Sequence, residues 1–164
     1  MLRKPVPAVS KLEGETVTDI GFYHLTRSGL DRALPQLLQK TIEAGKRALV
    51  VLGSEERVRF YDDHLWTYDS ASWMPHGSSR DGDPEMQPVW LDVTDANPNN
   101  AEFLFLADGG RSDRIGDFER CFDLFDGHDD EAVAEARERW KTLKDAGHEL
   151  TYWQQGERGW EKKA

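Results

Sequence analysis

The chain has 164 residues, a length that suits one domain with a single hydrophobic core. Hydrophobic residues make up 38% and charged residues 32%, and no apolar run approaches the roughly 20 residues of a membrane helix, so a soluble globular protein is predicted. The formal net charge of -10 disfavours unspecific binding to the phosphates of DNA or RNA. The lone cysteine excludes an internal disulfide and a cysteine metal cluster, which suits the reducing cytoplasm.

Both ends of the chain are predicted to lie outside the core. Residues 1–17 contain two prolines and no apolar periodicity, which indicates a flexible N-terminal extension. Residues 154–164 have the composition of a polar C-terminal tail, in which Trp160 could act as a local anchor. Residues 18–153 are therefore predicted to form the one domain.

Strand and helix patterns alternate through the first part of this domain. Residues 18–25 are rich in β-formers, and residues 30–46 place apolar side chains at helical spacing before a glycine stop. Residues 47–53 form a continuous apolar run, typical of a strand that is covered on both faces. A second helix is expected after Ser54, which suits an N-cap. This order predicts a mostly parallel α/β sheet.

The second part of the domain continues the sheet after a turn-rich segment, residues 67–87. Three more strands are predicted, at residues 88–93, 102–108 and 119–126. The last helix is expected to begin near Asp129, and Gly147 is expected to end it in a left-handed conformation.

The sequence contains no recognisable catalytic or cofactor motif. The first strand-to-helix turn has one glycine instead of a dinucleotide fingerprint, and the second lacks a phosphate loop, so a nucleotide-dependent enzyme is an alternative supported by strand order alone. The histidines are scattered, and the acidic run at residues 128–131 is better explained as a helix start than as a metal site. Cys121 lies in an apolar strand and is expected to be a small buried hydrophobe. We therefore expect no catalytic residue, metal or cofactor.

The predicted last helix has an apolar face and a basic stripe beside it. On a helical wheel Trp140 lies at the border between the two. The apolar face, which should meet the core, comprises Val133, Ala136, Trp140 and Leu143. The basic stripe comprises Arg137, Lys141 and Lys144.

The basic stripe is not arranged for helix stability. Arg137 and Lys144 have no acidic residue three or four positions away, and Arg137 and Lys141 are like charges one turn apart, which costs about 0.2–0.5 kcal/mol. By contrast, Arg139 follows Glu135 by four residues and is expected to be structural. We therefore predict that Arg137 and Lys141 bind an anionic partner. For Lys144 an ordinary solvated role is equally well supported.

The chemistry of this stripe suits a peptide that ends in a carboxylate and carries an aromatic or aliphatic side chain. The cations would hold the carboxylate, and Trp140 would provide an apolar wall. Phe125, just before the helix, could complete the wall or belong to the core. After the helix the chain turns back, which could bring Tyr152 and Trp153 within reach.

A second aromatic cluster lies in the turn-rich segment. Trp66, Tyr68, Trp73 and Met74 crowd a stretch that also contains a proline and a glycine. Core packing beneath a loop and docking of a partner protein are equally good explanations, because the centres of interfaces favour tryptophan, tyrosine and methionine.

Four stretches in this order, "FYHLT", "GKRALVVLGSEERV", "LWTYDSASWMPHG" and "ARERWKTLKDAGHELTYW", resemble the chi subunit of the bacterial DNA polymerase III holoenzyme. The resemblance spans about Asp19 to Trp153 and implies a single Rossmann-like α/β domain. It also implies a non-catalytic accessory protein of the clamp loader, located in the cytoplasm at the replisome. The implied partners are the psi subunit, with the clamp loader behind it, and the acidic C-terminal tail of single-stranded DNA-binding protein, which ends in a phenylalanine carboxylate.

The resemblance also assigns roles to individual residues. The family's tail-binding positions fall on Arg137, Lys141 and Trp140, the last being tyrosine in better-known relatives, and the strand residue of the phenylalanine pocket falls on Phe125. The psi-facing aromatics fall on Trp66 and Trp73, the latter usually phenylalanine. Little direct binding to nucleic acid is expected, although stacking of single-stranded bases on the tryptophans is a third hypothesis.

Overall fold

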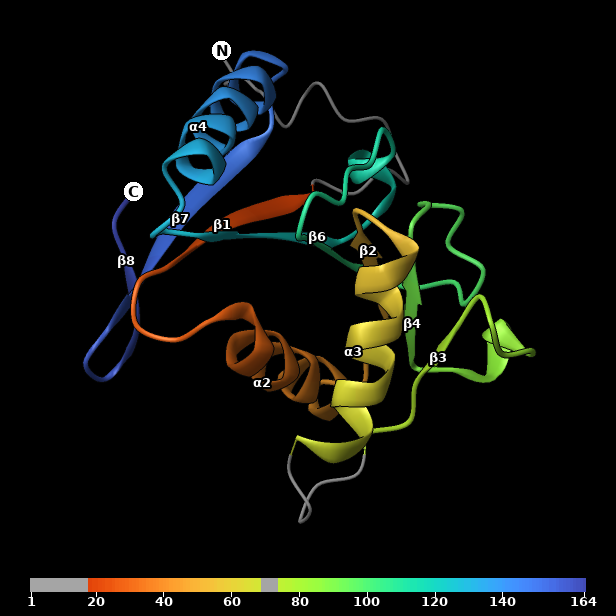
Figure 1. The fold of residues 1–164 in the computed structure, drawn as a ribbon. Helices are drawn as coiled ribbons and strands as arrows, with labels where there is room; N and C mark the ends of the chain where they lie inside the picture. Colours follow the sequence, from red (N-terminus) through yellow and green to blue (C-terminus); the bar gives the residue numbers. More distant parts are fainter. Residues whose placement is uncertain (1–17, 69–73) are drawn as a thin grey trace.

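The computed structural model describes residues 18–68 and 74–164, which form one eight-stranded sheet with helices on both faces (Figure 1). The strand order is β3-β4-β2-β5-β6-β1-β7-β8, and all neighbours are parallel except β7 and β8. The predicted α/β class with a mostly parallel, Rossmann-like sheet is confirmed. Residues 1–17 and Trp73, for which the sequence made specific predictions, lie outside the described residues.

The five predicted strands agree closely with β1, β2, β4, β5 and β6, whereas β3, β7 and β8 were not predicted as strands. β2 and β5 are fully buried along their length, as continuous apolar runs in the centre of a parallel sheet should be. The strands are β1 (Asp19–Leu25), β2 (Ala48–Leu52), β3 (Gly77–Ser78), β4 (Val89–Asp92), β5 (Phe103–Ala107), β6 (Arg120–Asp126), β7 (Glu149–Gly156) and β8 (Gly159–Lys162).

Three α-helices cover the sheet. α2 (Leu30–Glu43) and α3 (Glu55–Thr67) pack on one face, and α4 (Asp130–Asp145) packs on the other (Figure 1). Two short 3-10 turns, η1 (Pro84–Met86) and η2 (Ile115–Asp117), lie in the loops.

The predicted helix ends are confirmed by their capping geometry. Ser54 Oγ accepts a hydrogen bond from the Arg57 amide at 3.2 Å, and Asp129 caps α4 by accepting from the Glu131 amide at 3.0 Å. Beyond the C-terminus of α4, Gly147 has a φ of +95°, the left-handed conformation that was expected there. These caps fix where α4 begins and ends on the sheet.

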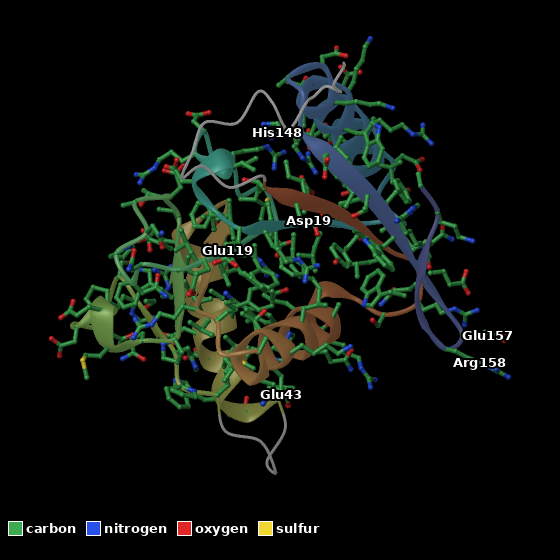
Figure 2. All side chains as sticks on the ribbon, turned by 180° about the vertical axis from the view of Figure 1, so that it is seen from behind. Asp19, Glu43, Glu119, His148, Glu157 and Arg158 are labelled. Carbon is green, nitrogen blue, oxygen red and sulfur yellow. The ribbon has the colours of Figure 1, made fainter. Side chains whose placement is uncertain are left out.

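Residues 154–164 do not form the polar tail that the composition suggested. β7 continues to Gly156, and β8 returns antiparallel beside it (Figure 1). Figure 2 shows Glu157 and Arg158 at the tip of this hairpin. Trp160 packs edge-on against Tyr23 with ring centroids 5.1 Å apart, so it belongs to the packed structure. The composition concealed the strand because β8 has one strand neighbour and its other residues are exposed.

None of the helices in the described residues is both long enough and apolar enough to cross a membrane.

Candidate partner-binding site

Helix α4 presents the predicted apolar face to the sheet. Ala136 is buried, and Val133, Trp140 and Leu143 are partly buried against the cluster of side chains beneath the helix. The wheel-based assignment of the core face is therefore confirmed. This packing leaves the neighbouring stripe of the helix exposed to solvent.

An aromatic wall lies beside Trp140. The centroid of its ring lies 5.3 Å from that of Phe22 and 5.9 Å from that of Tyr152, and both contacts are edge-to-face. Tyr152 in turn meets Phe125 at 6.3 Å, and Phe125 is 6% exposed. Phe125, for which a wall or a core position was expected, is thus a largely buried residue at the base of the wall.

Trp153 does not reach this wall, contrary to the expectation from the sequence. Successive residues of a strand point to opposite faces of the sheet, so Tyr152 faces α4 and Trp153 faces the other side. There the Trp153 ring lies parallel to Tyr23, with centroids 6.2 Å apart. Of Tyr152 and Trp153, only Tyr152 belongs to the aromatic wall beside α4.

The three cations of the basic stripe have no partners in the described chain. Arg137, Lys141 and Lys144 are exposed, and none makes an ion pair or hydrogen bond with residues 18–68 or 74–164. Lys141 lacks a pair even though Glu138 and Asp145 lie three and four positions away. The stripe therefore offers uncompensated positive charge beside the aromatic wall.

Arg139 lies two residues after Arg137 on α4 and is structural as expected, but its partner is not the predicted Glu135. Its guanidinium donates to both carboxylate oxygens of Asp123, at 2.7 and 2.8 Å, and the Asp123 side chain is 3% exposed. Glu135, the partner expected from helical spacing, instead pairs with Arg111 at 3.6 Å. The pairing of Arg139 with Asp123 could not be predicted from helical spacing, because Asp123 lies within an apolar strand.

His24 is a member of the site that the sequence analysis missed. Its Nδ1 lies 2.5 Å from the hydroxyl of Tyr152, and its ring stacks on Phe125 with centroids 4.9 Å apart. Burial lowers the pKa of His24, and the positive charges of Arg137 and His128 lower it further. The alternation of β1 placed His24 on the same face as Phe22, but the register of β1 against β6 and β7 was not available from sequence.

Trp66, predicted to dock a partner, lies on α3 and therefore on the other face of the sheet from α4. Its side chain is 50% exposed, and its ring rests on His76 with centroids 4.2 Å apart. Met74 of the same segment is buried, so the aromatic cluster divides between the core and the surface.

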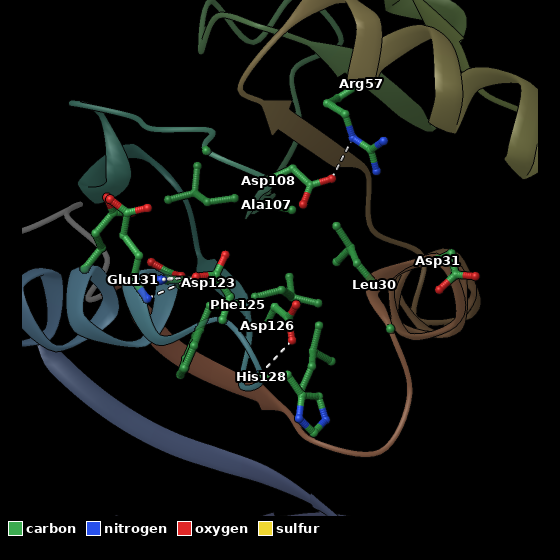
Figure 3. A pocket seen from close by; sticks show the side chains of 18 of the residues that line it. Leu30, Asp31, Arg57, Ala107, Asp108, Asp123, Phe125, Asp126, His128 and Glu131 are labelled. Atoms are coloured by element: carbon green, nitrogen blue, oxygen red, sulfur yellow. Dashed lines mark hydrogen bonds and ion pairs between the residues drawn. The ribbon is translucent and has the colours of Figure 1, made fainter.

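A cleft of about 820 Å³ opens at the carboxyl ends of the strands, between the N-termini of α2, α3 and α4 (Figure 3). This is where open α/β sheets usually bind ligands. Seven carboxylates and four arginines line it, so its formal charge is -3. The net negative charge disfavours phosphates.

The arginines of the cleft are already paired. Arg57 donates to Asp108 at 2.9 Å, a contact drawn in Figure 3, and Arg27 lies 4.0 Å from Glu157. The other two are Arg111 and Arg139, described above. The backbone amides of Gly53 and Gly110 at the strand ends are also used, by Asp108 and Ala107 carbonyls. The four arginines of the cleft and these two glycine amides are therefore engaged within the chain.

Two candidate features, the lone cysteine and the acidic run before α4, have structural roles. Burial raises the pKa of the Cys121 thiol well above its usual range, with Asp123 adding to the effect, so the reactive thiolate is suppressed. No cluster of metal-ligating side chains occurs in the described residues. The acidic run at residues 128–131 starts α4, with Asp129 as its cap, as expected.

The model of one protein family, described as the DNA polymerase III chi subunit, HolC, matches residues 17–151. The chain belongs to the DNA polymerase III chi subunit family. A chi relative, "Probable DNA polymerase III subunit chi" of Rickettsia prowazekii (strain Madrid E), is 27% identical over 84 residues. The aligned stretch spans 51% of each of the two proteins, about half the length of the relative. The resemblance to the chi family seen in the sequence is thus confirmed. Membership of this family assigns the chain to DNA replication.

Proposed function

We propose that this protein is a non-catalytic accessory subunit of the DNA polymerase III clamp-loader assembly, and that α4 binds the acidic C-terminal tail of single-stranded DNA-binding protein. In this function Arg137 and Lys141 hold carboxylates of the tail. Trp140, with Tyr152 and the base formed by Phe125, contacts its terminal phenylalanine. Lys144 extends the positive field along the helix.

The observation that carries this proposal is the pairing pattern of the cations on α4. In a chain of net charge -10, Arg137 and Lys141 lie without partners in the described residues, next to the partly buried rings of Trp140 and Tyr152. Arginine, lysine and aromatic rings in this arrangement suit a carboxylate with a large apolar side chain. The alternative of a nucleotide-dependent enzyme has less support, because the cleft has a formal charge of -3 and its arginines are already paired.

The test is fluorescence anisotropy with a labelled acidic peptide that ends in Asp-Ile-Pro-Phe. Binding should weaken as salt is raised, and Arg137→Ala or Lys141→Ala should each reduce affinity by about tenfold or more, the worth of a charge-assisted hydrogen bond. Arg158→Ala provides a matched control, because this exposed arginine lies at the distant hairpin tip (Figure 2). Equal affinities in the wild type and both α4 variants would refute the site.

The role of the terminal carboxylate is tested with the same peptide ending in an amide. If Arg137 and Lys141 hold that carboxylate, the amide should bind several-fold more weakly to the wild type. It should also be less sensitive to Arg137→Ala than the natural peptide. A loss of affinity that is identical for the two peptides would mean that the cations meet internal acidic residues instead.

We further propose that psi, which would connect the protein to the clamp loader, docks at Trp66. The half-exposed indole on α3 is an aromatic anchor of the kind that dominates interfaces, and it lies on the face of the sheet opposite α4. Trp66→Ala should therefore weaken psi binding in isothermal titration calorimetry and leave tail-peptide affinity unchanged. Loss of both activities would indicate a folding defect, and loss of neither would exclude Trp66.

A further inference from the structure

Three ring side chains from adjacent strands form a connected group next to Arg137. His24 on β1 stacks on Phe125 of β6, with which it is paired in register, and contacts Tyr152 of β7 through a 2.5 Å hydrogen bond. Tyr152 also meets His24 edge-on at a centroid distance of 5.8 Å. His24 therefore links the base of the aromatic wall to its exposed part.

The charges that act on His24 are positive. Arg137 on α4 and His128 in the loop before α4 both lower its pKa, in addition to the larger effect of burial. Arg137 also acts on Tyr152, where it opposes the rise in pKa that burial causes. Arg137 lies three residues before Trp140, whose ring meets Tyr152 with centroids 5.9 Å apart, so the arginine shares the part of α4 that borders this hydrogen-bonded pair.

Two carboxylates of β6, the strand next to His24, are engaged by other groups. Asp123 accepts from Arg139, and Asp126 accepts a hydrogen bond from the His128 amide at 2.8 Å. The His128 ring in turn contacts the carbonyl of Thr26 at 3.0 Å. No carboxylate of the described residues is among the charges that shift the pKa of His24.

We propose that His24 is part of the anion-binding site and takes up a proton when an anionic partner binds beside Arg137, so that the partner binds more tightly at mildly acidic pH. This inference rests on the proposed function of α4. A carboxylate at Arg137 cancels the positive field that disfavours a second charge on His24. The protonated imidazole would then donate from Nδ1 to the Tyr152 hydroxyl, an acceptor already in place.

The direction of the pH effect follows from linkage. If the complex holds more protons than the free protein, affinity must rise as pH falls, and by the same factor the bound anion must raise the pKa of His24. The acidic side chains and carboxylate of the peptide ionise near pH 4, so they do not contribute between pH 6 and 8.

The experiment is a titration of the same acidic peptide at pH 8 and pH 6, with constant ionic strength. The wild type should gain about two- to fivefold in affinity at the lower pH if the bound anion raises the pKa of His24 by about one unit, because the full tenfold is reached only below both pKa values. His24→Gln should bind with little pH dependence, while His64→Gln, on α3 at the opposite face of the sheet, should keep the wild-type dependence.

A measurement on the unmutated protein supports the test. The NMR signal of the His24 ring, followed against pH with and without peptide, should titrate at higher pH in the complex. A pKa that does not move, or a His24→Gln variant with the wild-type pH profile, overturns the inference even if Arg137→Ala abolishes binding. Absence of binding at both pH values would instead refute the proposed function of α4.

Discussion

Arginine is used in two different ways in two neighbouring regions of this molecule. In the cleft at the carboxyl ends of the strands each arginine lies opposite a carboxylate, as in the pairs Arg57–Asp108 and Arg139–Asp123. On the adjoining stripe of α4, Arg137 makes no such pair in the described chain. The arginines of the cleft are thus all paired, and Arg137 of the basic stripe is not paired within the described residues. The proposed binding site is therefore chosen by its unpaired positive charge and not by volume.

The largest expected effect comes from breaking a pair of the cleft. Arg139→Met leaves the buried carboxylate of Asp123 without a partner, which should lower the free energy of unfolding by about 3–5 kcal/mol. Urea denaturation monitored by tryptophan fluorescence measures this. Adding Asp123→Leu to the Arg139→Met variant removes the unpaired carboxylate and should recover much of the lost stability. If Arg139→Met alone were as stable as the wild type, the structural role of Arg139 would be contradicted.

A smaller effect is expected when Arg137 is given the partner that it lacks. Ala134 is exposed and lies three residues before Arg137, so Ala134→Glu should place a carboxylate beside that arginine. Asp130 and Glu138, each four residues from position 134, would repel the new carboxylate, so little net change in the stability of α4 is expected. The same change should weaken acidic-peptide binding several-fold, because the new carboxylate competes for Arg137. Ala134→Gln is the uncharged control in the anisotropy titration. Equal peptide affinity in the two variants would contradict the role of Arg137.

A weaker effect still is expected from an exposed pair of the cleft. Arg111 and Glu135 are both about half exposed and 3.6 Å apart, so Arg111→Ala should change the free energy of unfolding by no more than about 0.2–1 kcal/mol. Peptide affinity should stay within about twofold of wild type, because Arg111 lines the cleft and not the stripe. A large loss of affinity would extend the binding site into the cleft.

No effect is expected from nucleotides. Because the cleft has a formal charge of -3 and its arginines are paired, ATP, NAD and NADP at millimolar concentration should leave the melting temperature unchanged in a thermal-shift assay. A reproducible rise with any of them would revive the nucleotide-dependent enzyme. The acidic tail peptide, tested beside them, should raise the melting temperature.

The fold was largely predictable because local patterns determine it. Continuous apolar runs gave β2 and β5, and capping residues such as Ser54 and Gly147 gave the helix ends. The basic stripe of α4 was also visible, since helical spacing decides which side chains share a face.

The rest of the site depended on contacts between strands that are distant in sequence. His24 and Tyr152 are 128 residues apart, and only the register of β1 against β7 brings them together. Asp123 lies in an apolar run, so its role as the partner of Arg139 could not be read from spacing along the helix. Strand β8 was missed because its exposed residues gave it the composition of a tail.

The hairpin at the C-terminal end of the sheet bears on self-association. Without β8, the open backbone of β7 would form the sheet edge, and such an edge is a template for pairing with a second chain. β8 covers it and leaves a shorter edge of four residues that carries Glu161 and Lys162, side chains that discourage further strand addition. By covering the edge of β7, the strand that carries Tyr152, β8 should therefore reduce aggregation through strand pairing.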